Sequence, residues 1–212
     1  MMHIVLLGDS IFDNGAYVPD GPPVRDQLAT VMPGDAAVTL LAVDGDLSTH
    51  VPGQLRELPK DATHLVVSCG GNDALGFLPE FIKPVSTVAD AMVRFGELRG
   101  VFRERYRGML DAVTSQGLPV FACSVYEQVP NIGEAERAAL SMFNEIIFQE
   151  CHGRVNGIID LRVICGDAED YSEVSPIEPS ERGGRKIVQA IRAAVLGDAS
   201  HVVTPVIGAV HQ

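Results

Sequence analysis

Short apolar runs alternate along the chain with longer segments in which apolar residues recur at helical spacing. The runs are continuous and rich in β-branched residues, which is typical of strands that are buried on both faces of a parallel sheet. They occupy residues 3–8, 37–43, 63–69, 119–125 and 157–164. The sequence therefore predicts five buried strands.

The segments between the runs repeat apolar side chains every three or four residues, as helices do when one face packs on a core. They include Val24, Leu28 and Val31 and the stretches 86–116, 134–151 and 181–196. Alternating strands and helices predict an α/β sandwich. At roughly 150 residues per domain, and without a repeat or a long linker, we expect one domain over residues 1–212.

Charge and composition narrow the function classes. With 28 acidic against 16 basic residues the net charge is −12, which disfavours binding to nucleic acid or to anionic lipid. No segment has the roughly 20 apolar residues of a membrane span, and the first residues do not resemble a signal peptide. We therefore expect a cytoplasmic protein. The four cysteines lack C-x-x-C spacing, which predicts buried free thiols.

Candidate chemistry lies in the loops after the strands, because ligands of open parallel sheets bind outside the carboxyl ends of the strands. Ser10 follows the first strand, where a helix could begin, so it is either a helix cap or a nucleophile. Gly45 follows the second strand and Asn72 the third. Their N–H groups, with that of Ser10, could bind the oxyanion of a tetrahedral acyl-transfer intermediate.

Three motifs, in this order and spacing, resemble those of the SGNH or GDSL hydrolases. They are Gly8-Asp9-Ser10, Gly45, and Gly70-Gly71-Asn72-Asp73. The resemblance, from about residue 3 to residue 196, implies a three-layer α/β/α sandwich with strand order 2-1-3-4-5. It also implies hydrolysis of a carboxylic ester or related acyl group of a small molecule, with Ser10 as nucleophile and Gly45 and Asn72 in the oxyanion hole. No cofactor or metal is implied.

The fourth motif departs from the family pattern. The family carries D-x-x-H before its last helix, where this chain has Ser175 and Glu178. Glu178 is our provisional general base, although burial would have to raise its pKa from about 4.3 toward 7. The alternative is a carboxylate that is favoured by the dipole at the start of the helix near Ser180.

Two histidines offer other bases. His50 lies five residues after Gly45, near the start of a predicted helix that faces the same crevice. Asp198 and His201 have the D-x-x-H spacing, but they follow the last predicted helix and are expected at the opposite edge of the sheet. If no base is present, the alternative function is a weak or inactive relative that binds an acyl or glycosyl ligand in the same crevice.

Five aspartates crowd the predicted carboxyl edge of the sheet. Such a set could hold Mg²⁺, but aspartates at strand ends more often cap turns and helices. The residues concerned are Asp9, Asp13, Asp44, Asp46 and Asp73. We therefore favour the capping interpretation and expect no metal site.

Overall fold

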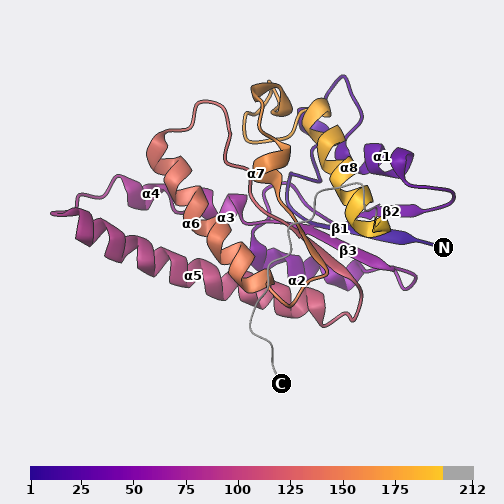
Figure 1. The fold of residues 1–212 in the computed structure, drawn as a ribbon, viewed down its shortest axis with the longest axis horizontal. Coiled ribbons are helices and arrows are strands. Elements are labelled where there is room, and N and C mark those ends of the chain that lie inside the picture. Colours follow the sequence, from indigo (N-terminus) through magenta and orange to yellow (C-terminus); the bar gives the residue numbers. More distant parts are fainter. Residues whose placement is uncertain (198–212) are drawn as a thin grey trace.

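The computed structural model describes residues 1–197, which form a five-stranded sheet with helices on both faces (Figure 1). All neighbouring strands pair in parallel, in the order β2-β1-β3-β4-β5. The strands are β1 (His3–Gly8), β2 (Ala37–Leu40), β3 (His64–Ser68), β4 (Val120–Cys123) and β5 (Gly157–Ile159). The α/β class and the strand order 2-1-3-4-5 are confirmed.

Helices from different parts of the chain share each face of the sheet. The α-helices are α1 (Val24–Val31), α2 (Val51–Gln54), α3 (Gly71–Leu75), α4 (Leu78–Phe81), α5 (Val88–Thr114), α6 (Glu134–Cys151), α7 (Leu161–Ile164) and α8 (Glu181–Leu196). Short 3-10 helices are η1 (Gly15–Tyr17), η2 (Ser48–His50), η3 (Leu55–Glu57) and η4 (Ala168–Asp170). α1 packs against α8, and α5 against α6.

The side chains of β1 show why the apolar runs are continuous. Val5 and Leu7 belong to the core cluster on the α5 and α6 face, while Ile4 and Leu6 belong to the cluster with α1 and α8. All four are fully buried. Because successive side chains of a strand point to opposite faces, a strand covered on both faces needs apolar residues at every position.

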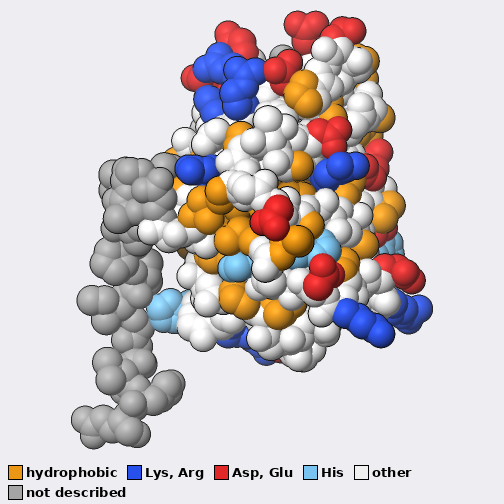
Figure 2. Space-filling model, turned by 90° about the vertical axis from the view of Figure 1, so that its right-hand side faces the viewer, with side chains coloured by type: hydrophobic (Ala, Val, Ile, Leu, Met, Phe, Trp, Pro, Cys, Tyr) orange, Lys and Arg blue, Asp and Glu red, His pale blue; other side chains and the backbone are white. Residues whose placement is uncertain are grey.

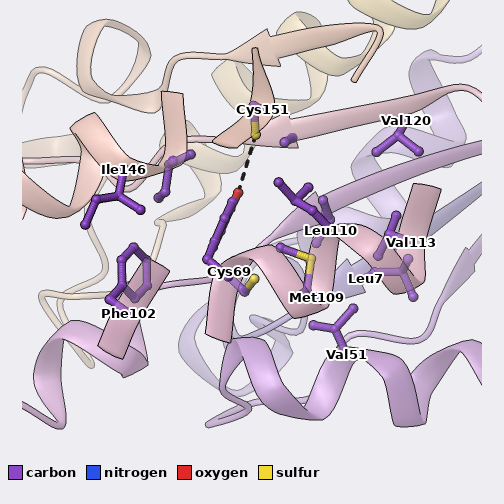
Figure 3. Packing of buried hydrophobic residues seen from close by; sticks show 14 of the residues in the cluster. Leu7, Val51, Cys69, Phe102, Met109, Leu110, Val113, Val120, Ile146 and Cys151 are labelled. Carbon is purple, nitrogen blue, oxygen red and sulfur yellow. Dashed lines mark hydrogen bonds between the residues drawn. The ribbon is translucent and has the colours of Figure 1, made fainter. Parts of the chain in front are cut away.

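The α5 and α6 face has a dense aromatic and aliphatic core. Figure 3 shows Phe102 and Leu110 of α5 with Ile146 and Cys151 of α6. A hydrogen bond joins Tyr106 Oη to Cys151 Sγ at 3.8 Å. All four cysteines are free and buried, as predicted.

Four of the predicted strands are shorter in the structure, and β2 and β5 lose the most residues at their carboxyl ends. β2 ends at Leu40 rather than at residue 43, and β5 ends at Ile159 rather than at residue 164. After β5 the Asp160 side chain accepts a hydrogen bond from Arg162 N and caps α7. A local side-chain bond to the backbone thus ends the strand within an apolar run. The helices predicted at 134–151 and 181–196 match α6 and α8.

Charged side chains of both signs are scattered over the face in Figure 2, among and around hydrophobic side chains. The acidic excess of the sequence therefore does not form a field of a single sign on that face. Among the helices of residues 1–197, none is long and apolar enough to cross a membrane.

Candidate active site

Ser10 lies at the carboxyl edge of the sheet because a glycine allows β1 to end close against β3. Gly8 has φ +121°, and a Cβ at this position would lie 1.8 Å from Ser68 O. The next residue continues the contact, since Asp9 N donates to Ser68 O at 3.1 Å. This approach places Ser10 beside the loop that follows β3.

A single turn, not a helix, follows Asp9. Phe12 N and Asp13 N both donate to Asp9 O, at 3.1 and 3.2 Å, and the next helical element is η1 at Gly15. The expectation that a helix could begin at Ser10 is therefore wrong. This leaves the Ser10 hydroxyl without a helix to cap.

The Ser10 hydroxyl donates to Glu178 Oε1 at 2.9 Å. Both residues are buried, with 5% of Ser10 and 4% of Glu178 exposed. Burial raises the pKa of Glu178 to about 7; the nearby charge of Asp44 adds to the rise, and the Ser10 hydrogen bond opposes it. The other oxygen, Glu178 Oε2, is buried and has no hydrogen-bond partner among the described residues. The structure thus brings together two predicted site residues that lie 168 positions apart.

The loop around Glu178 is held on both sides of that residue. Tyr126 Oη donates to the carbonyl of Ile177, and Asn14 Nδ2 donates to the carbonyl of Pro179 at 3.1 Å. Asn14 is fully buried and also accepts a hydrogen bond from the start of α1. These contacts restrict how the Glu178 side chain can approach Ser10.

Ser175, which stands where the family has its aspartate, contacts Glu178 through the backbone. Its carbonyl accepts a hydrogen bond from Glu178 N at 3.1 Å. In turn, Ser172 N donates to Glu178 O at 2.8 Å. The segment therefore fixes the backbone of Glu178 instead of orienting an imidazole. Ser180 caps α8 with its side chain, so Glu178 itself is not the capping residue of that helix.

The two other predicted oxyanion donors lie in neighbouring loops. Gly45 has φ +81°, a conformation that favours glycine, and Asn72 lies in the first turn of α3. Asn72 Nδ2 donates to Asp46 O at 3.1 Å, which connects the two loops. Among the hydrogen bonds of residues 1–197, none uses the backbone N–H of Ser10 or Gly45.

Gln54 connects the same loops to the end of β1. Its Oε1 accepts from Gly8 N at 2.9 Å, and its Nε2 donates to Gly8 O at 2.7 Å and to Asp46 Oδ2 at 2.8 Å. The side chain is 8% exposed. Sequence reasoning missed this residue, because a glutamine in a short helix carries no pattern that indicates partners 46 positions away.

Asp73 joins the loops after β2 and β3. Its carboxylate accepts from Ser48 N at 2.8 Å and from Ser48 Oγ at 2.9 Å, and the residue is 1% exposed. Ser48 was also missed from the sequence. Together with Gln54, this pair cross-links the loops that carry the candidate donors.

His50 pairs with Asp46 and not with Ser10. Its Nδ1 lies 3.0 Å from Asp46 Oδ1, and about half of the His50 side chain is exposed. The hydroxyl of Ser10 is bonded to Glu178 instead. Asp198 and His201, the other candidate pair, lie outside the described residues.

The remaining aspartates of the edge take part in turns. Asp13 Oδ2 accepts from Asp44 N at 3.0 Å, and Asp44 Oδ2 accepts from the Tyr17 hydroxyl at 2.8 Å. Asp9 Oδ1 accepts from Ile11 N at 3.2 Å. Burial, aided by the charge of Glu178, raises the pKa of Asp9 well above its usual range. Within residues 1–197, no group of three or more His, Cys, Asp or Glu side chains is arranged to hold a metal ion.

An apolar pocket opens beside Ser10. Its volume is about 140 Å³, and its walls come from the loops after β1, β3 and β4, from α3, α4 and α6, and from the Glu178 loop. The residues that line it include Ser10, Asn72, Leu78, Ala139, Phe143 and Ile177. An apolar cavity of roughly 150 Å³ is large enough to bind benzene, so this pocket can take a nonpolar group.

A comparison with known families identifies the family of the chain. Residues 6–186 match the model of the GDSL-like lipase/acylhydrolase family, a range that includes Ser10, Gly45, Asn72 and Glu178. The chain belongs to this family. No curated protein matches the sequence.

Several solved structures share the family fold. A lipase from a goat rumen metagenome is 22% identical, with a TM-score of 0.70, covering 92% of this chain and 97% of that one. A lipase/acylhydrolase from Enterococcus faecalis is 20% identical (TM-score 0.64; 93% and 96% covered). The esterase EstA from Pseudoalteromonas sp. is 15% identical (TM-score 0.61; 93% and 98% covered). These similarities show the fold, and membership of the family supports ester hydrolysis in general.

Proposed function

We propose that the protein is a serine hydrolase that cleaves a carboxylic ester or related acyl group, with Ser10 as nucleophile and Glu178 as general base. One observation carries the proposal, namely the buried hydrogen bond of 2.9 Å from Ser10 Oγ to Glu178 Oε1. A base works best when its pKa lies near the working pH. The pKa of Glu178, raised to about 7, meets that requirement without a histidine.

The reaction follows from the positions of these two groups. Ser10 Oγ attacks the carbonyl carbon while its proton passes to Glu178, and a tetrahedral oxyanion forms. The bond from carbon to the alcohol oxygen then breaks, and the alcohol leaves with the proton from Glu178. In the second half, Glu178 takes a proton from water, the resulting hydroxide attacks the acyl-enzyme, and the proton returns to Ser10 Oγ as the acid departs.

The oxyanion would be bound by the Ser10 N–H, the Gly45 N–H and the Asn72 side-chain amide. Support comes from the contacts of Asn72 and Gln54 with Asp46, which hold the Gly45 loop near the end of β1. Donors fixed in advance stabilise a developing charge without reorganisation during the reaction.

Covalent labelling tests the proposal. A fluorophosphonate should form an adduct on Ser10, identified by peptide mass spectrometry, and Ser10→Ala should abolish the adduct and greatly slow hydrolysis of a short-chain ester. The test needs both readouts, because an oxyanion hole alone can retain roughly 10³-fold to 10⁴-fold acceleration over water. If folded wild-type protein forms no adduct, and hydrolyses the ester no faster than Ser10→Ala, the proposal is wrong and the crevice is a binding site.

A further inference from the structure

The side chain of Gln54 bonds to β1 where strand pairing with β2 has ended. β1 pairs with β2 only as far as Leu6, and β2 itself ends at Leu40. Gly8 lies beyond this pairing and is buried, so its N–H needs another partner. Gln54 Oε1 accepts from Gly8 N at 2.9 Å, and Gln54 Nε2 donates to Gly8 O at 2.7 Å. The amide thus supplies one acceptor and one donor, as a neighbouring strand does.

These bonds act on the peptide group that precedes the candidate nucleophile. Gly8 O belongs to the peptide between Gly8 and Asp9, and the N–H of the same peptide donates to Ser68 O at 3.1 Å. Gln54 and β3 therefore hold this peptide from opposite sides. The next peptide along the chain carries the N–H of Ser10, which is one of the proposed oxyanion donors. Its direction depends on the peptide before it, because only the two backbone dihedrals of Asp9 separate the two planes.

A third bond extends from Gln54 to the loop after β2. Gln54 Nε2 donates to Asp46 Oδ2 at 2.8 Å, and Asp46 directly follows Gly45. The backbone carbonyl of Asp46 in turn accepts from Asn72 Nδ2 at 3.1 Å. One glutamine, 8% exposed, is therefore connected to all three segments that carry the proposed oxyanion donors.

Both ends of the Gln54 side chain are fixed. The amide oxygen and the amide nitrogen are both bonded, and the reverse orientation would place Gln54 Oε1 against two acceptors, Gly8 O and Asp46 Oδ2. The backbone of Gln54 belongs to α2, which packs against β1 and α5. Val51, at the start of that helix, is fully buried. The packing of α2 therefore determines where the amide of Gln54 lies among the loops.

We propose that Gln54 is a positioning residue, which holds the three oxyanion donors of the proposed hydrolase in their catalytic arrangement. Through the end of β1 it orients the N–H of Ser10. Through Asp46 it holds the Gly45 N–H and the side-chain amide of Asn72. The inference rests on the proposed function. Because Gln54 is not among the described residues that line the pocket beside Ser10, its loss should impair the transition state and leave substrate binding intact.

The first test removes the three hydrogen bonds with Gln54→Met, which keeps a side chain of similar length. For p-nitrophenyl acetate, kcat should fall by about tenfold to 10²-fold, since a misplacement of about 1 Å at a catalytic site costs up to about that much. KM should stay within about twofold of the wild type. A trifluoromethyl ketone, whose adduct with Ser10 carries an oxyanion, should bind more weakly by the same factor by which kcat/KM falls.

Gln27→Met is the matched control. Gln27 is 7% exposed, and its Nε2 donates to Pro22 O at 2.9 Å and to Glu181 O at 3.2 Å, away from the oxyanion donors. This variant should lose thermal stability but keep kcat per folded molecule and the affinity for the ketone. If Gln54→Met also keeps both values, or if the two variants lose kcat equally, Gln54 is a structural residue and the proposal is wrong.

Asp46→Ala keeps the test decisive if Gln54→Met does not fold, because the Asp46 side chain is 22% exposed. It removes the acceptor of Gln54 Nε2 but retains the backbone carbonyl that bonds to Asn72. We expect kcat to fall by about tenfold. His50→Gln is the control here, since it removes the other contact of the Asp46 carboxylate. Equal kcat values for Asp46→Ala and His50→Gln would overturn the proposal.

Failure of the proposed function gives a different result, which Ser10→Ala reveals. If Ser10→Ala hydrolyses the ester as fast as the wild type, no oxyanion forms on Ser10, and the proposed function is overturned together with the role of Gln54. If Ser10→Ala slows hydrolysis greatly while Gln54→Met matches Gln27→Met in kcat, the proposed function stands and the role of Gln54 alone is overturned.

Discussion

Two polar pairs lie in the loops at the carboxyl edge of the sheet, Ser10 with Glu178 and His50 with Asp46. Residue type alone favours the histidine as a base, because histidine titrates near neutral pH and glutamate does not. The structure reverses this order. Ser10 and Glu178 are both buried, and the hydroxyl of Ser10, the candidate nucleophile, donates a hydrogen bond to Glu178. The His50 side chain, in contrast, is about half exposed and pairs with Asp46. Burial and geometry, more than residue type, decide which group can act as the base.

The largest expected effect is that of removing the buried base. Glu178→Gln keeps the shape of the side chain but cannot accept the Ser10 proton, so kcat/KM should fall by about 10²-fold to 10⁴-fold. The rate of fluorophosphonate labelling at Ser10 should fall in parallel. Ester hydrolysis and labelling by mass spectrometry measure the two effects. Wild-type rates in the folded variant would show that another group is the base.

Loss of an oxyanion donor should have the next largest effect. Asn72→Ala should reduce kcat by roughly 10²-fold to 10³-fold, as removal of one donor does in other hydrolases. The melting temperature should change little, because Asn72 is only half-buried and contributes one bond to Asp46. Steady-state kinetics and thermal unfolding together separate the roles. A variant that unfolds but keeps full activity per folded molecule would make Asn72 a structural residue.

The pH dependence of activity follows from the raised pKa of Glu178. The base must be ionised, so log kcat/KM should fall by about one unit per pH unit below the pKa of about 7 and level off above it. Assays between about pH 5 and 9 would show this limb. An unchanged limb in Glu178→Gln, measured on its residual activity, would assign the titration to a different residue.

Stability should depend on pH in the opposite direction to activity. The pKa of Glu178 is about 7 in the folded protein and lies near 4.5 when the carboxyl is free, so between these values the folded state binds more protons. The contribution of the protonated carboxyl to stability is complete below about pH 4.5 and is lost as the pH rises through 7. Glu178→Gln resembles the protonated form and should be more stable than the wild type above pH 7, by about 3 kcal/mol.

Denaturant unfolding of both proteins at the two ends of this pH range measures the difference. At about pH 4.5 the two free energies of unfolding should agree to within about 1 kcal/mol. A glutamine variant that is less stable than the wild type at high pH would indicate that the carboxylate is stabilised by contacts, and that its pKa is not raised.

The smallest expected effect is that of the exposed pair. His50→Gln should change kcat/KM less than about twofold, because the His50 ring bonds to Asp46 and not to Ser10. His50→Gln and Glu178→Gln, assayed with one ester, form a matched comparison of the two pairs. Loss of activity in His50→Gln alone would transfer the role of base to His50.

Much of the fold could be predicted because buried strands and helices have characteristic local patterns of apolar residues in the sequence. The residues of β1 form a continuous apolar run because helices cover both faces of the strand. The segments 134–151 and 181–196, in which apolar residues recur at helical spacing, agree with the observed bounds of α6 and α8. The end of β5 could not be predicted from hydrophobicity. There the apolar run continues, and the side chain of Asp160 ends the strand by a bond to the backbone.

At the site, the sequence by itself determined the residue types and their order, namely the motif around Ser10, the glycine and asparagine after later strands, and a glutamate where the family has histidine. Only the tertiary structure decided that Glu178, rather than His50, bonds to Ser10, and that it does so in a buried environment. The physical reason is that a pKa and a hydrogen bond depend on what surrounds a side chain. For Glu178 these surroundings come from Asn14, Tyr126 and Asp44, which are far from it in sequence.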